Sequence, residues 1–473
     1  MWDLTRFAGS PAVSDDRGGS LTYGQLDAAC RGLYGAVGRR CLVFCLCDNR
    51  LGSLVGYAGF LDHGVVPIML KRSLDGELLA SLYREYRPAY IWLPEEDVSG
   101  LPMGRECREA YGAFGYTLLQ TPFGEGAPLH EALALLLTTS GSTGSPKLVR
   151  QSYENIRANT ESIAAYLHLT PDERPITTLP MNYTYGLSIL NTHLFVGAHI
   201  LLSDKSLMQR EFWSFFRDGA ATSFGGVPYT YEMLKRLRFF RMDLPSLRTM
   251  TQAGGRLLPE LHREFAEYAR DTGRAFVVMY GQSEATARMA YLPPERSLEK
   301  VGSMGVPIPG GRFELLDADG SVVTEPNRTG ELVYYGKNVT LGYAACADDL
   351  KKGDENGGRL ATGDMAQRDE EGFYTIVGRK KRFLKIFGNR VNLDDAERLI
   401  RGGLDIEAVC GGQDDRLYIF FTAGEERGPA LRKWLSEKTG LPRSAIRAVH
   451  IDAIPYNESG KVLYRALEAY YDE

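Results

Sequence analysis

Residues 137–147 constrain this chain more than any other segment, because a strand pattern runs directly into a loop rich in hydroxyl groups and glycine. The segment reads Leu-Thr-Thr-Ser-Gly-Ser-Thr-Gly-Ser-Pro-Lys and follows the apolar run 133–137, which predicts a β-strand. Glycine lets a backbone approach an anion closely, and successive N–H groups can bind phosphate oxygens together with serine and threonine hydroxyls. We therefore expect a strand followed by a phosphate-binding loop.

The spacing of this loop differs from that of a P-loop NTPase. Lys147 follows Pro146 instead of a glycine, and Leu148 stands where that motif has serine or threonine. A Ser/Thr/Gly run is also typical of an exposed flexible loop, so composition alone leaves both interpretations open. Other segments have to decide between them.

Four later motifs decide it, because with this loop they form an ordered set that resembles the adenylate-forming superfamily of acyl-CoA synthetases, peptide-synthetase adenylation domains and luciferases. The five segments are 140–147 (Ser-Gly-Ser-Thr-Gly-Ser-Pro-Lys), 280–286 (Tyr-Gly-Gln-Ser-Glu-Ala-Thr), 362–364 (Thr-Gly-Asp), 378–385 (Gly-Arg-Lys-Lys-Arg-Phe-Leu-Lys) and 455–461 (Pro-Tyr-Asn-Glu-Ser-Gly-Lys). The resemblance extends from about Leu21 to Arg465. It implies ATP and Mg²⁺ as cofactors.

Composition and charge argue against several other classes of protein. A chain of 473 residues is expected to form two or more domains, and the formal net charge of −5 argues against a general nucleic-acid binder. No apolar run approaches the ~20 residues of a membrane-spanning helix, and the first residues lack a signal-peptide pattern. The seven cysteines show no paired CxxC pattern. We expect a cytoplasmic protein with reduced thiols and no membrane span.

The hydrophobic pattern predicts an α/β fold. Strand and helix patterns alternate between residues 42 and 279, which is typical of βαβ layers with largely parallel sheets, and short β patterns with turns follow from residue 311. The predicted architecture is a large N-terminal domain of layered βαβ subdomains plus a small β-rich subdomain, followed by a small mobile α+β C-terminal domain. The predicted strands include 42–47, 89–93, 176–179, 199–202 and 275–279, and the predicted helices include 154–167, 259–270 and 394–400.

The resemblance aligns the hinge of the family with Lys381. It implies a large ATP- and acid-binding adenylation domain at residues 1–380 and a small lid domain at residues 381–473. The cluster Lys380, Lys381 and Arg382 is equally compatible with a solvated basic turn.

Activation of a carboxylic acid by ATP needs no general base, because the acid is already ionised at neutral pH. The site must position two anions and neutralise the charge that develops at phosphorus. Lysine, Mg²⁺ and loop amides supply that charge, so the scarcity of histidine in these motifs agrees with the chemistry.

The resemblance assigns roles to individual residues. Lys461 would bridge the substrate carboxylate and the α-phosphate, and Lys385 would serve thioester formation after the lid rotates. Glu284 would hold Mg²⁺, which prefers oxygen ligands. The phosphate-binding residues would be Thr139, Ser140, Gly141, Ser142, Thr143, Gly144 and Lys147, and the adenine- and ribose-binding residues would be Gly254, Gly255, Arg256, Tyr280, Gly281, Asp364 and Arg379.

Each of these residues has a simpler alternative when it is considered alone. Tyr280 ends an apolar run and could be a core residue, and the Thr-Gly-Asp motif that contains Asp364 is a common turn. Glu284 and Lys461 could be exposed surface charges. Their combined order favours the functional interpretation.

The acid pocket is predicted from segment 179–187, which resembles the substrate wall of the family. Tyr183 stands where many acyl-CoA ligases have histidine, and the segment lacks the aspartate that pairs an α-ammonium group in amino-acid-activating relatives. A proteinogenic α-amino acid is therefore disfavoured, since its buried ammonium would be unpaired. The candidate pocket residues are Tyr183, Tyr185, Gly225, Gly254 and Gly305, with core packing as the alternative for both tyrosines.

The expected function is ATP-dependent activation of a small-molecule carboxylic acid to an acyl-adenylate, with release of pyrophosphate, followed by transfer to a thiol. The acid has an apolar or aromatic body, and aryl and fatty acids both remain open. The thiol is that of coenzyme A or, alternatively, the phosphopantetheine of an acyl carrier protein. A luciferase-type oxidase and a non-catalytic nucleotide-binding scaffold are the other readings, and a monomer and a homodimer are both compatible with the sequence.

Overall fold

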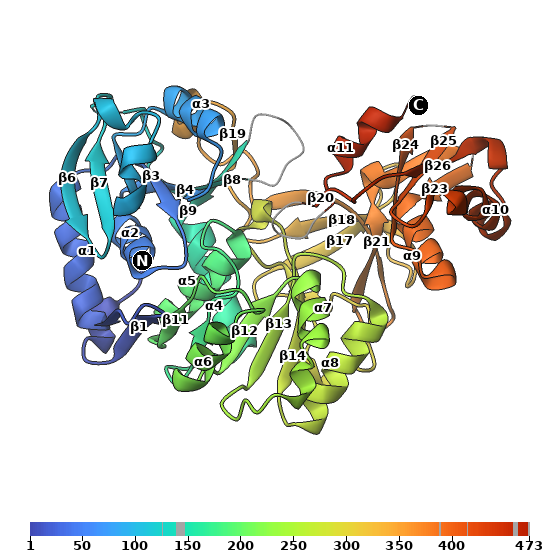
Figure 1. The fold of residues 1–473 in the computed structure, drawn as a ribbon, viewed down its shortest axis with the longest axis horizontal. Coiled ribbons are helices and arrows are strands. Elements are labelled where there is room, and N and C mark those ends of the chain that lie inside the picture. Colours follow the sequence, from blue (N-terminus) through green and yellow to red (C-terminus); the bar gives the residue numbers. More distant parts are fainter. Residues whose placement is uncertain (125, 139–146, 387–388, 414, 457–461, 472–473) are drawn as a thin grey trace. The chain divides into compact units, whose positions relative to one another are not determined.

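The computed structural model describes the chain except residues 125, 139–146, 387–388, 414, 457–461 and 472–473 (Figure 1). The chain divides into two compact units. The first comprises most of residues 1–312 together with 334–360, and the second comprises 313–333 and most of 361–473. No helix in the described part of the chain has both the length and the apolar character for crossing a membrane.

One of the two large sheets of the first unit has eight strands. Strands β3, β4, β5 and β8 form its parallel centre, and antiparallel strands close both edges. All six residues of β3 are buried, which explains why its sequence is a continuous apolar run. The spatial order is β19 (Gly342–Ala344), β9 (Leu148–Ser152), β8 (Leu133–Thr138), β4 (Val66–Lys71), β3 (Leu42–Cys47), β5 (Tyr90–Pro94), β7 (Tyr116–Gln120) and β6 (Arg108–Ala113).

The other large sheet has nine strands. Its centre, from β1 to β14, is parallel, and β2, β15 and β16 pair antiparallel at the edges. The spatial order is β16 (Val306–Pro307), β15 (Ala290–Tyr291), β14 (Ala275–Tyr280), β13 (Thr249–Gln252), β12 (Ser223–Gly226), β10 (Pro175–Ile176), β11 (Ile200–Leu202), β1 (Pro11–Asp15) and β2 (Ser20–Thr22).

The largest hydrophobic core of this unit joins the two sheets. It contains Val43 and Leu135 from the eight-stranded sheet and Val13 and Ile200 from the nine-stranded sheet, together with side chains of α1, α2 and α5. Helix α2 is apolar nearly all round, as expected for a helix enclosed by other elements. The helices are α1 (Tyr23–Val37), α2 (Leu51–Asp62), α3 (Gly76–Tyr86), α4 (Tyr153–Tyr166), α5 (Thr184–Val196), α6 (Arg210–Asp218), α7 (Pro228–Arg236) and α8 (Pro259–Asp271).

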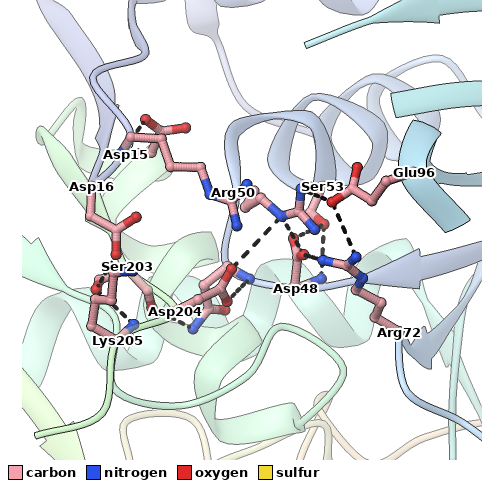
Figure 2. A network of polar contacts seen from close by, with 12 residues as sticks. Asp15, Asp16, Asp48, Arg50, Ser53, Arg72, Glu96, Ser203, Asp204 and Lys205 are labelled. Carbon is pink, nitrogen blue, oxygen red and sulfur yellow. Dashed lines mark hydrogen bonds and ion pairs between the residues drawn. The ribbon is translucent and has the colours of Figure 1, made fainter. Parts of the chain in front are cut away.

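A charged network also joins strand ends of the two sheets (Figure 2). Arg50, just after β3, contacts Asp48, Glu96 at 2.8 Å and Asp204 at 3.8 Å. Asp204 lies just after β11, and Arg72, just after β4, also pairs with Asp48 and Glu96. Burial, followed by the negative charge of Asp48, raises the pKa of Asp204 to about 6. Because every named cation has carboxylate partners, the network is best explained as a structural link.

The second unit is built around small sheets with helices. Helices α9 (Leu393–Leu404) and α10 (Gly428–Thr439) contribute Ile400, Leu431 and Leu435 to a core with β24, β25 and β26. The strands are β17 (Arg312–Leu316), β18 (Gly330–Tyr335), β20 (Arg359–Arg368) and β21 (Tyr374–Arg379) in one sheet, β22 (Phe383–Ile386) and β23 (Asn389–Asn392) in a hairpin, and β24 (Ala408–Gln413), β25 (Arg416–Phe421) and β26 (Ile446–His450) in a third sheet. A short helix, α11 (Tyr464–Leu467), follows.

These elements confirm the predicted α/β fold, with one shortened strand. The strand predicted at 176–179 ends at Ile176, because the side chains of Thr177 and Thr178 then donate to the carbonyls of Ser203 and Gly225. The predicted domain boundary at 380/381 marks a hinge at Lys381 about which the lid would rotate, whereas the division into two units follows how compactly each part of the chain packs. Both that boundary and the mobility of the lid stay predictions.

Candidate functional site

The predicted phosphate loop joins two paired strands of the first unit. Strands β8 and β9 are antiparallel neighbours, with Thr138 opposite Leu148. The candidates Thr139, Ser140, Gly141, Ser142, Thr143 and Gly144 lie outside the described residues. Lys147 is described: it is exposed, and its Nζ atom lies 5.8 Å from the ring centroid of Tyr343.

Tyr343 connects Lys147 with the predicted metal ligand. Its hydroxyl donates a hydrogen bond of 2.6 Å to Oε1 of Glu284. Burial and then the nearby Glu284 carboxylate raise the pKa of Tyr343, so that the hydroxyl keeps its proton at neutral pH. The sequence motifs do not include Tyr343, since an aromatic residue in a weak β pattern carries no signal of such a contact. Lys147, Tyr343 and Glu284 thus form one constellation.

A sharp turn after β14 presents Glu284. A Cβ atom at Gly281 would lie 1.7 Å from the Ala287 carbonyl oxygen, so the turn requires glycine there. Thr286 has φ +64° and ψ −60°, a strained γ-turn conformation that the Ala287 N–H to Ala285 carbonyl bond of 2.7 Å closes. Strain of this kind persists only where surrounding contacts hold it. The Thr286 hydroxyl supplies one by donating to the Asn338 carbonyl at 2.7 Å.

The adenine-binding candidates of this unit lie at one sheet edge. Tyr280 ends β14, and Gly254 and Gly255 follow the parallel neighbour β13, so both segments emerge at the carboxyl ends of strands. Tyr280 is half-buried and accepts a hydrogen bond of 3.2 Å from Gln282, whereas Arg256 is exposed. The structure therefore brings these candidates to the edge from which Glu284 also projects.

The two other nucleotide candidates pair within the second unit. Asp364 in β20 lies directly opposite Arg379 in β21, and Oδ1 of Asp364 is 3.1 Å from Nε of Arg379. The side chain of Asp364 is 4% exposed and that of Arg379 is 62% exposed. Gly363 has φ +70°, a left-handed conformation that suits glycine. The common Thr-Gly-Asp turn is here part of a strand with a buried carboxylate.

The catalytic and hinge candidates are only partly described. Lys461 lies outside the described residues, and only the backbone is described for Lys381, in a 3-10 helix, and for Lys385, in β22. Between them, Arg382 pairs with Asp394 and, at 2.5 Å, with Glu397. The basic segment is therefore not simply a solvated turn, because Arg382 is anchored, while the roles of the three lysines stay predictions.

Most of the acid-pocket candidates meet in one hydrophobic cluster. Tyr183 and Tyr185 lie at the start of α5, with ring centroids 6.3 Å apart. A Cβ atom at Gly225 would lie 2.9 Å from the Tyr185 hydroxyl, and one at Gly254 would lie 2.7 Å from the Tyr183 hydroxyl. The glycines were expected to leave volume beside the aromatic rings, and the tyrosine hydroxyls occupy that volume. Their role in acid binding stays a prediction.

Gly305 is required for a different reason. It has φ +87°, and a Cβ atom there would lie 1.9 Å from the Tyr291 carbonyl oxygen. Tyr291 stacks on Tyr166 with ring centroids 4.1 Å apart, at the same hydrophobic cluster. Close backbone approach therefore explains this glycine.

Comparison with known proteins identifies the family. The profile described as "AMP-binding enzyme" matches residues 2–344. The chain belongs to this AMP-binding enzyme family. Feruloyl-CoA synthase from Amycolatopsis sp is 28% identical over 345 residues, covering 70% of this chain and 68% of that protein. 2-Succinylbenzoate–CoA ligase from Geobacillus kaustophilus is 28% identical over 352 residues, covering 72% and 69%.

Solved structures agree with this fold. O-succinylbenzoate CoA synthetase from Bacillus subtilis, in complex with ATP and magnesium ion, has a TM-score of 0.78 at 22% identity and covers 98% of both chains. An anthranilate CoA ligase in complex with anthranoyl-AMP has a TM-score of 0.77 at 20% identity and covers 99% of this chain and 96% of that one. The predicted family and α/β fold are confirmed, and the predicted class of AMP-forming acid–thiol ligase agrees with the CoA-ligase relatives.

Proposed function

We propose that this AMP-binding enzyme activates a carboxylic acid with ATP, releases pyrophosphate and transfers the acyl group from the adenylate to coenzyme A. The observation that carries the proposal is the contact between Tyr343 and Glu284, which holds a carboxylate beside the end of the 139–147 segment and Lys147. A phosphate-binding loop, a cation and a metal-binding carboxylate are the groups that phosphoryl chemistry requires.

Glu284 fits a magnesium ligand. The side chain is half-buried, and among the described residues only Tyr343 hydrogen bonds to it, through Oε1, so that Oε2 remains for a metal. A carboxylate oxygen is a ligand that Mg²⁺ prefers. When bound, Mg²⁺ would neutralise charge on the departing pyrophosphate. Tyr343 would keep Glu284 oriented toward it.

The other residues divide the work between binding and positioning. Lys147 and the loop amides would neutralise the β- and γ-phosphates, while Tyr280 and the glycines after β13 would border the adenine. Asp364, with both carboxylate oxygens as acceptors, would bind the ribose hydroxyls beside Arg379. Lys461 would neutralise the charge that develops between the acid and the α-phosphate. The ionised acid attacks directly, so no protein base is needed.

Coenzyme A is the acceptor that we favour, because the curated relatives are CoA ligases. Rotation of a lid about Lys381 would bring Lys385 to the acyl-adenylate for this second step. An acyl carrier protein is the alternative acceptor. We place the reaction in the cytoplasm, where ATP and coenzyme A are both available, and the choice between a monomer and a homodimer stays open to measurement.

The test is acid-dependent ATP–pyrophosphate exchange without any thiol, over aryl, fatty, hydroxy and amino acids. We expect exchange with one class of acid, nearly abolished in Lys461→Ala and retained in Lys433→Ala, a matched change at a lysine whose side chain is 61% exposed. Undiminished exchange in Lys461→Ala would remove its catalytic assignment. Silence of the wild-type protein with every acid, despite ATP binding, would favour the nucleotide-binding scaffold.

Two further variants test the parts of the mechanism separately. Tyr343→Phe removes the donor to Glu284, so we expect the Mg²⁺ requirement of the exchange reaction to rise about 10-fold, as for other residues that orient metal ligands. Lys385→Ala should impair thioester formation with coenzyme A more than adenylation. An unchanged Mg²⁺ dependence in Tyr343→Phe would contradict the role of Tyr343 in orienting Glu284. Equal damage to both half-reactions in Lys385→Ala would contradict the role of Lys385 in thioester formation.

A further inference from the structure

Arg288 is a buried cation that no sequence motif singled out. It lies just after the strained turn that presents Glu284, and only 3% of its surface is exposed. Its backbone is held from two sides: its N–H donates to Oδ1 of Asn159 at 3.2 Å, and its carbonyl accepts from the side chains of Asn159 and Asn338. These contacts fix the position of the Arg288 backbone, from which the side chain extends.

The guanidinium lies in the aromatic cluster that holds the acid-pocket candidates. Its Cζ atom is 3.8 Å from the ring centroid of Tyr185, and its Nε donates to the sulfur of Met279 at 3.3 Å. The hydroxyl of Tyr166 also interacts with it. Throughout the described parts of the chain, no carboxylate lies within ion-pair distance of Arg288.

The neighbouring tyrosines do not neutralise this charge. Burial raises the pKa of Tyr166, of Tyr183 and, to about 12, of Tyr185, and in each case the positive charge of Arg288 only partly opposes the rise. All three hydroxyls therefore stay protonated and neutral at pH 7. Contacts with an aromatic face and a thioether offset only part of the cost of removing a guanidinium from water.

Arg288 is also well placed for a ligand in the predicted acid pocket. It covers one face of Tyr185, a candidate residue of that pocket, and the other tyrosine candidate, Tyr183, directly precedes the same helix, is only partly buried and borders the cluster. A guanidinium matches the planar geometry of a carboxylate through two parallel hydrogen bonds. An anionic group on the substrate would supply the counter-ion that Arg288 lacks.

We propose that the acid substrate is a dicarboxylic acid: one carboxylate is activated by ATP, and Arg288 binds the other. This inference rests on the proposed adenylation reaction and specifies its substrate class. Arg288 touches the distal end of the acid and not the reacting atoms, so it determines specificity. It replaces the expectation of an acid whose body is purely apolar or aromatic.

The experiment compares ATP–pyrophosphate exchange, without thiol, for dicarboxylic acids and for their half-amides, which keep the shape and lose one charge. In the wild-type protein we expect kcat/KM for one diacid to exceed that of its half-amide about 100-fold, the scale of a buried charge-assisted contact. In Arg288→Met the preference should disappear, with the half-amide rate retained, and Arg288→Lys should restore part of it.

Arg274→Met is the matched control, because Arg274 also lies over a tyrosine ring, with its Cζ 5.2 Å from the centroid of Tyr268, outside the acid pocket. It should leave the preference for the diacid unchanged. Equal loss of preference in both variants would overturn the assignment to Arg288.

The outcomes separate this inference from the proposed function. If the wild-type protein accepts monocarboxylic acids or half-amides as well as the diacids, the role of Arg288 is wrong while the ligase stands. If no acid supports exchange in a folded protein that binds ATP, both are wrong. The wild-type comparison needs no variant, so it decides the matter even if Arg288→Met does not fold.

Discussion

Two buried arginines of the same unit have opposite surroundings. Arg150, in β9, is 0% exposed and donates to four backbone carbonyls, those of Leu341, Tyr343, Lys352 and Gly353, as well as to the carboxylate of Glu355. Arg288 is almost as buried and has an aromatic ring, a thioether and a neutral hydroxyl as neighbours. The degree of burial of a charged side chain therefore does not reveal its role.

The difference follows from what the local chain supplies. The segment from Leu341 to Gly353, which includes β19, passes around the Arg150 side chain and provides its carbonyls, so the guanidinium fixes this segment together with Tyr343, the partner of Glu284. The charged segment 347–358 is thus not simply a solvated loop, because it includes the 3-10 helix Ala347–Lys351 and carries partners of Arg150. The surroundings of Arg288 contain no such acceptors among the described residues, which leaves its charge for a ligand.

The largest expected effect is on Arg150. Arg150→Met should lower the free energy of unfolding by about 4 kcal/mol, because it leaves buried carbonyls unpaired and removes an ion pair. Urea unfolding followed by tryptophan fluorescence measures the change. A loss below about 1 kcal/mol would mean that the segment rearranges and that the comparison between the two arginines fails.

The opposite sign is expected for Arg288. Arg288→Met should raise the free energy of unfolding by about 1 kcal/mol, since it removes a buried charge that lacks a counter-ion and places an apolar chain among aromatic rings. The same urea measurement applies, without any acid present. A loss of about 3 kcal/mol would identify Arg288 as a structural cation instead of a ligand-binding one.

A smaller effect separates charge from hydrogen bonding at Arg150. Glu355→Gln keeps an acceptor oxygen for the guanidinium and removes the negative charge, and the Glu355 side chain is 47% exposed. We therefore expect a loss of only about 1 kcal/mol, because water already screens this pair. If the loss equals that of Arg150→Met, the carbonyl contacts contribute little.

The smallest effect extends the comparison to an anion, Asp204, in the charged network between the strand ends. The pKa of Asp204 in the folded protein, about 6, lies above its ordinary value of 3.8, so the folded state binds the proton more tightly than the unfolded chain. Stability should then fall as the pH rises from about 4 to about 6. Asp204→Asn should remove this dependence and gain about 0.5 kcal/mol at pH 7, since 34% of the side chain is exposed. Equal pH profiles of both proteins would contradict the assignment.

Much of the fold could be predicted because local pattern and burial coincide. The apolar run 42–47 is β3, and the helix pattern that begins with Pro259 is α8. The segment 176–179 was misjudged, since side-chain hydrogen bonds from Thr177 and Thr178 end the strand early. The periodicity of apolar residues does not show where side-chain hydrogen bonds compete with the backbone hydrogen bonds of a strand.

The sequence by itself determined the family and the order of the motifs, whose segments carry their own signals, whereas the pairing of Asp364 with Arg379 depends on how β20 and β21 align in the fold. Only the tertiary structure decided that Tyr343 holds Glu284, that tyrosine hydroxyls fill the space beside Gly225 and Gly254, and that Arg288 lies over Tyr185. These contacts join residues far apart in the chain. Which residues meet depends on how strands and helices pack, and packing leaves no periodicity or spacing in the sequence from which these contacts could be predicted.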